Sequence, residues 1–244
     1  MIRGLIGKKI GMTEIFNKEG NMIPVTVVET GPCTILELKE TPIRKVTVGF
    51  EPIKESRVNK PRLGLFKKVG VLPLRTIREF PSTDNKDYKL GQELKADVFK
   101  AGDWVDVTGT SIGKGFQGGM KLHHWRGGGA THGSMHHRRV GSISASTDPG
   151  RTVVGHPMPA HMGAQTKTVQ GLRVMAVNLD KNFLLIKGAV PGYVSSTLLI
   201  SLSQKKKFKA LDEKRVVVAH KVNPMKQSKK AAGAAAKAKI AKAK

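Results

Sequence analysis

Short runs in which apolar residues alternate with polar ones recur over the first 51 residues of the chain. Four of them are rich in Val, Ile and Thr and cover residues 2–10, 23–29, 34–39 and 45–50. Turn-forming residues separate the runs, as at the Gly31-Pro32 step. This pattern is typical of antiparallel strands, so we expect this part of the chain to form strands of a barrel or a sandwich.

The same alternation returns later in the chain. It predicts strands over residues 74–80, 98–107, 168–177, 183–187 and 197–202, with turns at 101–103, 178–182 and 188–192 and a polar loop over 84–91. Residues 59–69 instead favour a helix, with Asn59 as its cap and Pro61 in its first turn. Gly64 is unfavourable inside a helix. The sequence therefore predicts a mainly β protein with a partly helical excursion over about residues 52–97.

Residues 108–163, which we call the arm, interrupt the strand pattern. The arm has 13 Gly, seven His and six Lys or Arg among its 56 residues, and Asp148 is its only acidic residue. Its apolar residues follow neither a strand nor a helix period. A long irregular segment inside a compact domain is usually functional or disordered. Because predicted strands flank it, we expect a long loop inserted between two strands of one barrel.

The charge of the chain indicates what kind of partner it binds. The 244 residues include 43 Lys or Arg against 18 Asp or Glu, a net charge of +25. The arm carries a net +5, and the tail over residues 205–244 carries a net +12. Such an excess indicates a polyanionic partner. We expect the Ala- and Lys-rich tail to be disordered in the free protein, apart from a short strand or helix at 216–220.

The cysteine count and the lack of long apolar runs indicate the cellular compartment of the protein. The single cysteine, Cys33, excludes an intrachain disulfide and fits a reducing compartment. No run of residues is long and apolar enough for a membrane helix, and the N-terminus lacks the apolar core of a signal peptide. We therefore expect a cytoplasmic protein without a membrane partner.

Several patterns suggest enzyme or cofactor chemistry, but each lacks a required part. Residues 113–118 fit G-x-G-x-x-G, but no acidic residue follows at the spacing of a dinucleotide site. The arm's histidines have no neighbouring Cys and only Asp148 as a carboxylate, so we expect no metal site. No orienting acid accompanies the arm's Ser and His residues. We therefore expect no cofactor, no small-molecule substrate and no enzymatic activity.

The residue types of the arm instead suit RNA. Lys and Arg neutralise phosphates, and His and Trp stack on bases. For Trp125 we favour insertion into RNA over packing beneath its own loop. The sequence of residues 7–13 fits two alternatives equally well. Either the backbone there approaches RNA closely, or it forms a simple bulge whose lysines are solvated. The predicted RNA-binding residues are Lys8, Lys9, Lys114, Lys121, His123, His124, Trp125, Arg126, His132, His136, His137, Arg138, Arg139 and Arg151.

These segments resemble the bacterial type of the universal large-subunit ribosomal protein L-three family, over nearly the whole chain to about Gln204. The resemblance implies a closed β-barrel of the translation-factor type, formed by residues 1–107 and 164–204, and an arm threaded through ribosomal RNA. The most specific matching segments are residues 7–13, 106–111, 113–116, 130–133, 139–143, 149–151, 162–163 and 187–192.

The resemblance also implies a function. Members are structural components of the large ribosomal subunit that bind 23S-type rRNA near its 3′ end, act early in assembly and position rRNA near the peptidyl-transferase centre. The expected partners are large-subunit rRNA and neighbouring ribosomal proteins. One alternative is a general nucleic-acid-binding or chaperone protein that acts through its basic tail. Another is an RNA-modifying enzyme on a translation-factor barrel, for which the sequence offers no carboxylate or nucleotide site.

Overall fold

The computed structural model describes residues 2–17, 19–40, 43–83, 88–206 and 208–211. In chain order the elements are β1 (Gly4–Phe16), β2 (Met22–Glu29), β3 (Cys33–Lys39), β4 (Lys45–Pro52), η1 (Glu55–Arg57), α1 (Lys60–Val69), β5 (Leu74–Pro81), β6 (Glu93–Leu94), η2 (Ala96–Val98), β7 (Trp104–Thr110), β8 (Gly115–Gln117), α2 (Gly119–Leu122), β9 (Ala160–Met162), β10 (Thr166–Asn178), β11 (Phe183–Lys187) and β12 (Thr197–Leu202). The mainly β fold predicted from the sequence is confirmed.

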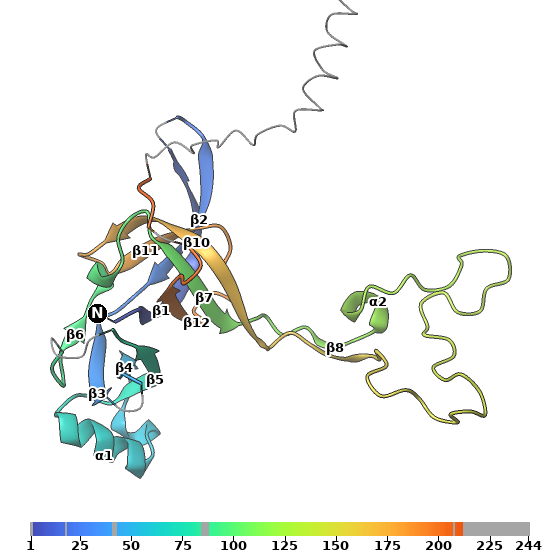
Figure 1. The fold of residues 1–244 in the computed structure, drawn as a ribbon, viewed down its shortest axis with the longest axis horizontal. Coiled ribbons are helices and arrows are strands. Elements are labelled where there is room, and N and C mark those ends of the chain that lie inside the picture. Colours follow the sequence, from blue (N-terminus) through green and yellow to red (C-terminus); the bar gives the residue numbers. More distant parts are fainter. Residues whose placement is uncertain (1, 18, 41–42, 84–87, 207, 212–244) are drawn as a thin grey trace, which may run out of the picture. The chain divides into compact units, whose positions relative to one another are not determined.

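Six strands form a ring in the order β1-β12-β7-β10-β11-β2 (Figure 1). The ring closes because β1 pairs antiparallel with both β12 and β2. Every second side chain of these strands tends to point into the ring and form its core. In β12, for example, Leu198 and Ile200 are fully buried while Thr197 is exposed. Burial of these aliphatic side chains is the main favourable contribution to folding.

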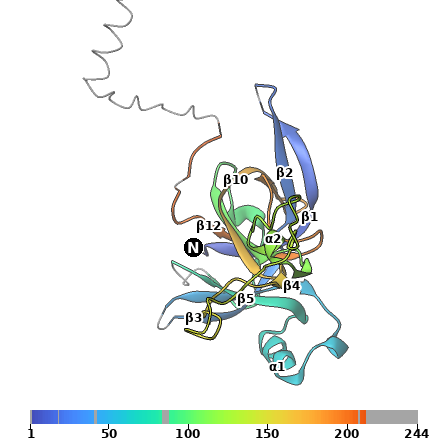
Figure 2. The ribbon, with the colours of Figure 1, turned by 90° about the vertical axis from the view of Figure 1, so that its right-hand side faces the viewer.

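Strands β3, β4 and β5 form a second sheet with the two-residue strand β6, in the order β5-β4-β3-β6. Helix α1 packs on it through Phe66, which clusters with Leu36 and Leu74 (Figures 1 and 2). A continuous apolar core joins the sheet to the ring, and Phe80 of β5 occupies the space beside Gly4 of β1 that a side chain would fill. The second sheet begins at Cys33, earlier in the chain than the excursion expected from about residue 52.

Two local predictions differ from the structure. Asn59 precedes α1, but its side chain makes no capping hydrogen bond, and the helix ends at Gly70 with a φ of 73°. The strand predicted over residues 98–107 begins only at Trp104, because η2 occupies its start. The side chains of Ala96 and Val98 are buried although they belong to a short 3₁₀ turn. Alternating apolar residues are therefore buried at this point without forming a strand.

The first residues of the tail pack against the ring. The Lys206 amine lies 4.1 Å from the centroid of the Trp104 ring. One Arg173 guanidinium nitrogen donates to the carbonyl oxygens of Lys209 and Ala210, at 3.0 and 2.7 Å. Disorder was predicted for the whole of residues 205–244, and these first residues instead lie against the ring. The rest of that range, with the strand or helix predicted at 216–220, falls on residues 212–244, which lie outside the described residues. No helix in the described ranges is long and apolar enough to cross a membrane.

We expect Leu5→Ala to lower the free energy of unfolding by about 2–5 kcal/mol, because it leaves a cavity at a fully buried core position. Leu72→Ala removes the same atoms from a side chain that is 74% exposed, and surface changes usually stay within about 0.5 kcal/mol. Chemical denaturation of the two variants measures the difference. Equal effects would contradict the placement of Leu5 in the core.

Candidate nucleic-acid interface

The arm begins as a continuation of the β7–β10 ladder. Thr110 pairs with Thr166 at the end of that ladder. Beyond it, the Ser111 amide donates to the carbonyl oxygen of Gln165 at 2.9 Å, and the Lys114 amide donates to that of Met162 at 2.8 Å. Strand β8 then pairs antiparallel with β9. The two chain segments at the base of the arm are therefore joined by backbone hydrogen bonds that need no apolar core.

Further along, glycines allow two segments of the arm to pack together. The Gly128 amide lies 3.0 Å from the carbonyl oxygen of His136 and 3.2 Å from that of His137, and donates to both. A side chain at Gly128 would collide with the His136 carbonyl, and one at Gly127, where φ is 76°, would meet the His137 carbonyl at 2.5 Å. These glycines are needed for the arm's own packing, whatever they also do toward RNA.

Trp125 is half-buried against the short helix α2. Its ring fills the space where a Gly119 side chain would lie, and its centroid is 5.7 Å from that of His123. His123 in turn places Nε2 3.0 Å from the carbonyl oxygen of Met158. Trp125 thus has a packing site within its own arm. Packing beneath its own loop was the less favoured of the two alternatives predicted for Trp125. Insertion into RNA stays a prediction for its exposed part.

The six basic residues of the arm point to solvent. All six are exposed, and none has a side-chain hydrogen bond or ion pair with another described residue: Lys114, Lys121, Arg126, Arg138, Arg139 and Arg151. Cations of this kind are available to phosphates, and their binding would release counterions from the RNA. The structure therefore leaves the charge of the arm uncompensated by the described protein.

The predicted histidines fall into two groups. His123 and His137 each place a ring nitrogen 3.0 Å from a backbone carbonyl of the arm, that of Met158 and that of Gly129 respectively. The exposed rings of His124, His132 and His136 have no hydrogen-bond partner among the described residues. Among those same residues, no three His, Cys, Asp or Glu side chains come together as a metal site would require.

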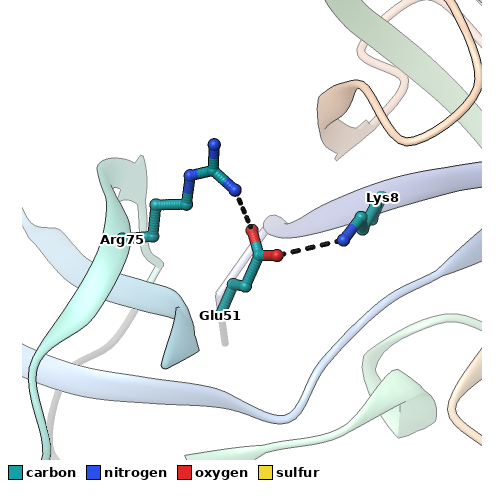
Figure 3. A network of polar contacts seen from close by, with 3 residues as sticks. All are labelled: Lys8, Glu51 and Arg75. Atoms are coloured by element: carbon teal, nitrogen blue, oxygen red, sulfur yellow. Dashed lines mark hydrogen bonds and ion pairs between the residues drawn. The ribbon is translucent and has the colours of Figure 1, made fainter. Parts of the chain in front are cut away.

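Lys8, by contrast, has a partner within the protein. Its amine donates to Glu51 Oε1 at 3.0 Å, and Arg75 Nη1 lies 3.4 Å from the other carboxylate oxygen (Figure 3). Glu51 reaches this position from a backbone with a φ of 62°. The carboxylate therefore offsets part of the charge of both cations, and the RNA contact predicted for Lys8 stays a prediction.

Lys9 also contacts the protein. Its amine donates to the carbonyl oxygens of Val190 and Gly192, at 3.2 and 3.0 Å, and thereby ties β1 to the turn before β12. The pairing of β1 with β2 shifts register between Lys9 and Gly11, so a bulge lies in this segment. The bulge expected in one of two alternatives is present, but Lys8 and Lys9 bond within the protein and are not simply solvated as that alternative expected. An RNA contact of Lys9 stays a prediction.

Two aromatic side chains near the base of the arm escaped the sequence analysis. Phe116 of β8 lies directly opposite His161 of β9, and both are exposed. Phe116 is 74% exposed and is separated from Lys114 by one residue. Flat rings beside a cation are a common surface for single-stranded RNA. The sequence does show Phe116 as an aromatic residue inside a Gly- and Lys-rich segment. Only the pairing of β8 with β9 reveals that His161 lies beside it.

The only cysteine offers no reactive nucleophile. Cys33 is fully buried where the second sheet meets the ring. Burial raises the pKa of its thiol to about 12, and the thiol donates a hydrogen bond to the Ile6 carbonyl oxygen at 3.4 Å. A thiol with so high a pKa stays protonated at neutral pH, and the thiolate is the reactive form.

Known proteins resemble the chain over most of its length. A family model described as Ribosomal protein L3 matches residues 75–182. The large ribosomal subunit protein uL3 of Brachyspira hyodysenteriae is 43% identical over 209 residues, which cover 84% of this chain and 96% of the relative. That of Heliobacterium modesticaldum is 48% identical over 208 residues, 84% of this chain and 99% of the relative. That of Acetivibrio thermocellus is 47% identical over 204 residues, which cover 82% of this chain and 96% of the relative.

The packing of Trp125 generates a test. We expect Gly119→Ala to displace the indole, because the added methyl group occupies the volume of its ring. In a Trp104→Phe background, fluorescence emission of the remaining tryptophan should then shift to longer wavelength. Gly118→Ala is the matched control, since its methyl group would meet nothing within 4 Å. An unchanged spectrum for Gly119→Ala, or equal shifts for both variants, would contradict this packing.

Proposed function

The chain belongs to the ribosomal protein L3 family, and from that premise we propose that it binds large-subunit rRNA through its arm and supports the assembly of that subunit. At the coarser level, family membership makes the chain a structural constituent of the large ribosomal subunit. Ribosomal proteins of this family are a structural class, distinct from enzymes. We place the protein in the cytoplasm, as part of that subunit.

One observation carries the proposal for the arm: its six basic side chains lie on one element with Asp148 as the only acidic residue, and none has a partner inside the described protein. The ion pair of Lys8 with Glu51 and the carbonyl contacts of Lys9 use positive charge within the folded body. The arm's six basic side chains have no such contact in the described part of the chain. Positive charge gathered on one element without internal partners is the electrostatic footprint of a nucleic-acid-binding surface.

The mechanism follows from the geometry of the arm. RNA helices that converge around a thin protein segment repel each other through their phosphates, and bound Lys and Arg reduce that repulsion. The hydrogen-bonded base of the arm and the glycine packing near Trp125 hold the cations on a narrow support. Exposed His and Trp rings can stack on unpaired bases. The protein thereby positions RNA, and any catalytic chemistry nearby belongs to the RNA.

Three finer statements rest on the family resemblance. We propose that the protein binds 23S-type rRNA near its 3′ end, that it joins the subunit early in assembly and that its arm reaches toward the peptidyl-transferase centre. The closed ring of six strands supports the expected likeness to translation-factor barrels. Contacts with neighbouring ribosomal proteins belong to the same proposal.

Sucrose gradients test this function. We expect the wild-type protein to remain with large subunits after a high-salt wash, because salt strips proteins held only by phosphate contacts, whereas an arm enclosed by RNA stays in place. In cells that depend on Arg138→Ala/Arg151→Ala, incomplete large subunits should accumulate, because two exposed cations of the arm are lost.

Lys67→Ala/Lys68→Ala is the control for charge alone. Both lysines are exposed in the last turn of α1, so the variant loses the same charge outside the arm, and its gradient should match that of the wild type. Release of the wild-type protein to the top of the gradient would favour a general nucleic-acid-binding protein. Equal assembly defects in the two variants would contradict a specific role of the arm.

A further inference from the structure

The arm forms an open pocket of about 350 Å³ beside Trp125, which we call the cavity. This volume lies within the range of roughly 300–1,000 Å³ that is usual for small-ligand pockets. Besides the backbone of Gly127 and Gly128, the lining side chains are Trp125, His136, Arg139, Val140, Ser142 and His156. They provide three aromatic rings, one cation, one hydroxyl group and a single aliphatic group, with no carboxylate.

One wall of the cavity is fixed by backbone packing. The Gly128 amide donates to the carbonyl oxygens of His136 and His137, and the His137 Nδ1 atom lies 3.0 Å from the carbonyl oxygen of Gly129. The His136 carbonyl occupies the space that a side chain at Gly128 would need. These contacts hold the segment with His136 and Arg139 against the glycines without any help from a ligand.

Another part of the lining is fixed by Trp125. Its ring packs on Gly119 and lies beside His123, which is anchored to the carbonyl of Met158. Trp125 therefore lines the cavity in a defined orientation. A site whose walls are set before binding loses less conformational entropy when it is occupied.

We propose that this cavity binds one unstacked nucleobase of the large-subunit rRNA, an inference that rests on the proposed function. Proteins that read unpaired RNA place splayed-out bases against aromatic rings or guanidinium planes. Trp125, His136 and His156 offer such faces. Arg139 is exposed and without a partner among the described residues, so it is available to a phosphate of the same nucleotide.

The lining also distinguishes a base from other occupants. Val140 is the only aliphatic side chain, which disfavours an apolar peptide or acyl chain, and the absence of a carboxylate in the lining disfavours a cationic ligand. The other five basic residues of the arm add positive charge to the same segment of the chain, which favours a base that belongs to a polynucleotide over a free nucleotide.

Two alanine variants at adjacent glycines test the proposal. Gly128→Ala forces its methyl group into the His136 carbonyl and so displaces one wall, whereas a methyl group at Gly129 meets only the Thr131 carbonyl, at an ordinary 3.6 Å. Large subunits containing each variant would be probed at every rRNA nucleotide by base alkylation and 2′-hydroxyl acylation. We expect Gly128→Ala to raise the reactivity of one unpaired nucleotide several-fold, and Gly129→Ala to leave that nucleotide protected.

Trp125→Leu provides the second variant, because it keeps an apolar group on Gly119 but removes the stacking face. It should expose the same nucleotide, and it decides the question if Gly128→Ala does not enter subunits. Unchanged reactivities in subunits that contain the variants, exposure of different nucleotides by the two variants, or equal effects of Gly128→Ala and Gly129→Ala would overturn the base site. Failure of the proposed function would be distinct, since wild-type protein would then be missing from the subunits before any probing.

Discussion

The arm depends on close contact between backbone segments at positions that have no side chain. Its apolar residues are too scattered to form a core, so burial of hydrophobic surface cannot order it as it orders the ring. Backbone hydrogen bonds at its base and the contact of Gly127–Gly128 with His136–His137 take that role. A support built in this way stays thin, which leaves nearly all of its polar side chains exposed to a partner.

The folded body and the arm use positive charge differently. In the body, Lys8 shares the Glu51 carboxylate with Arg75, and a hydrogen bond from Lys39 to Glu79 raises the pKa of that lysine. Exposed pairs of this kind contribute little to stability, but they reduce the charge that the surface presents. The arm has almost no acidic residues, so its charge remains directed outward. The scarcity of carboxylates in the arm thus leaves its positive charge without compensation from within that segment.

The sequence was informative wherever a local pattern determines the structure. Runs rich in Val, Ile, Leu and Thr between turn residues predicted β2, β4, β11 and β12 to within about two residues, because such side chains are buried in a sheet. They did not predict that β4 joins a second sheet, since strand partners are chosen by contacts between distant residues. For the same reason, composition predicted that the arm is a binding segment, but the packing of Trp125 on Gly119 required the three-dimensional structure.

The central claim is that the arm is an rRNA-contacting element whose shape is set by its own glycines. A density map of the large ribosomal subunit that contains this protein, at a resolution that shows side chains, tests the claim most directly. We expect the arm between rRNA helices, with Arg126, Arg138 and Arg151 within ion-pair distance of phosphates and Gly128 still packed on His136. An arm whose cations face solvent or other proteins, or whose glycine contacts are absent, would contradict the account.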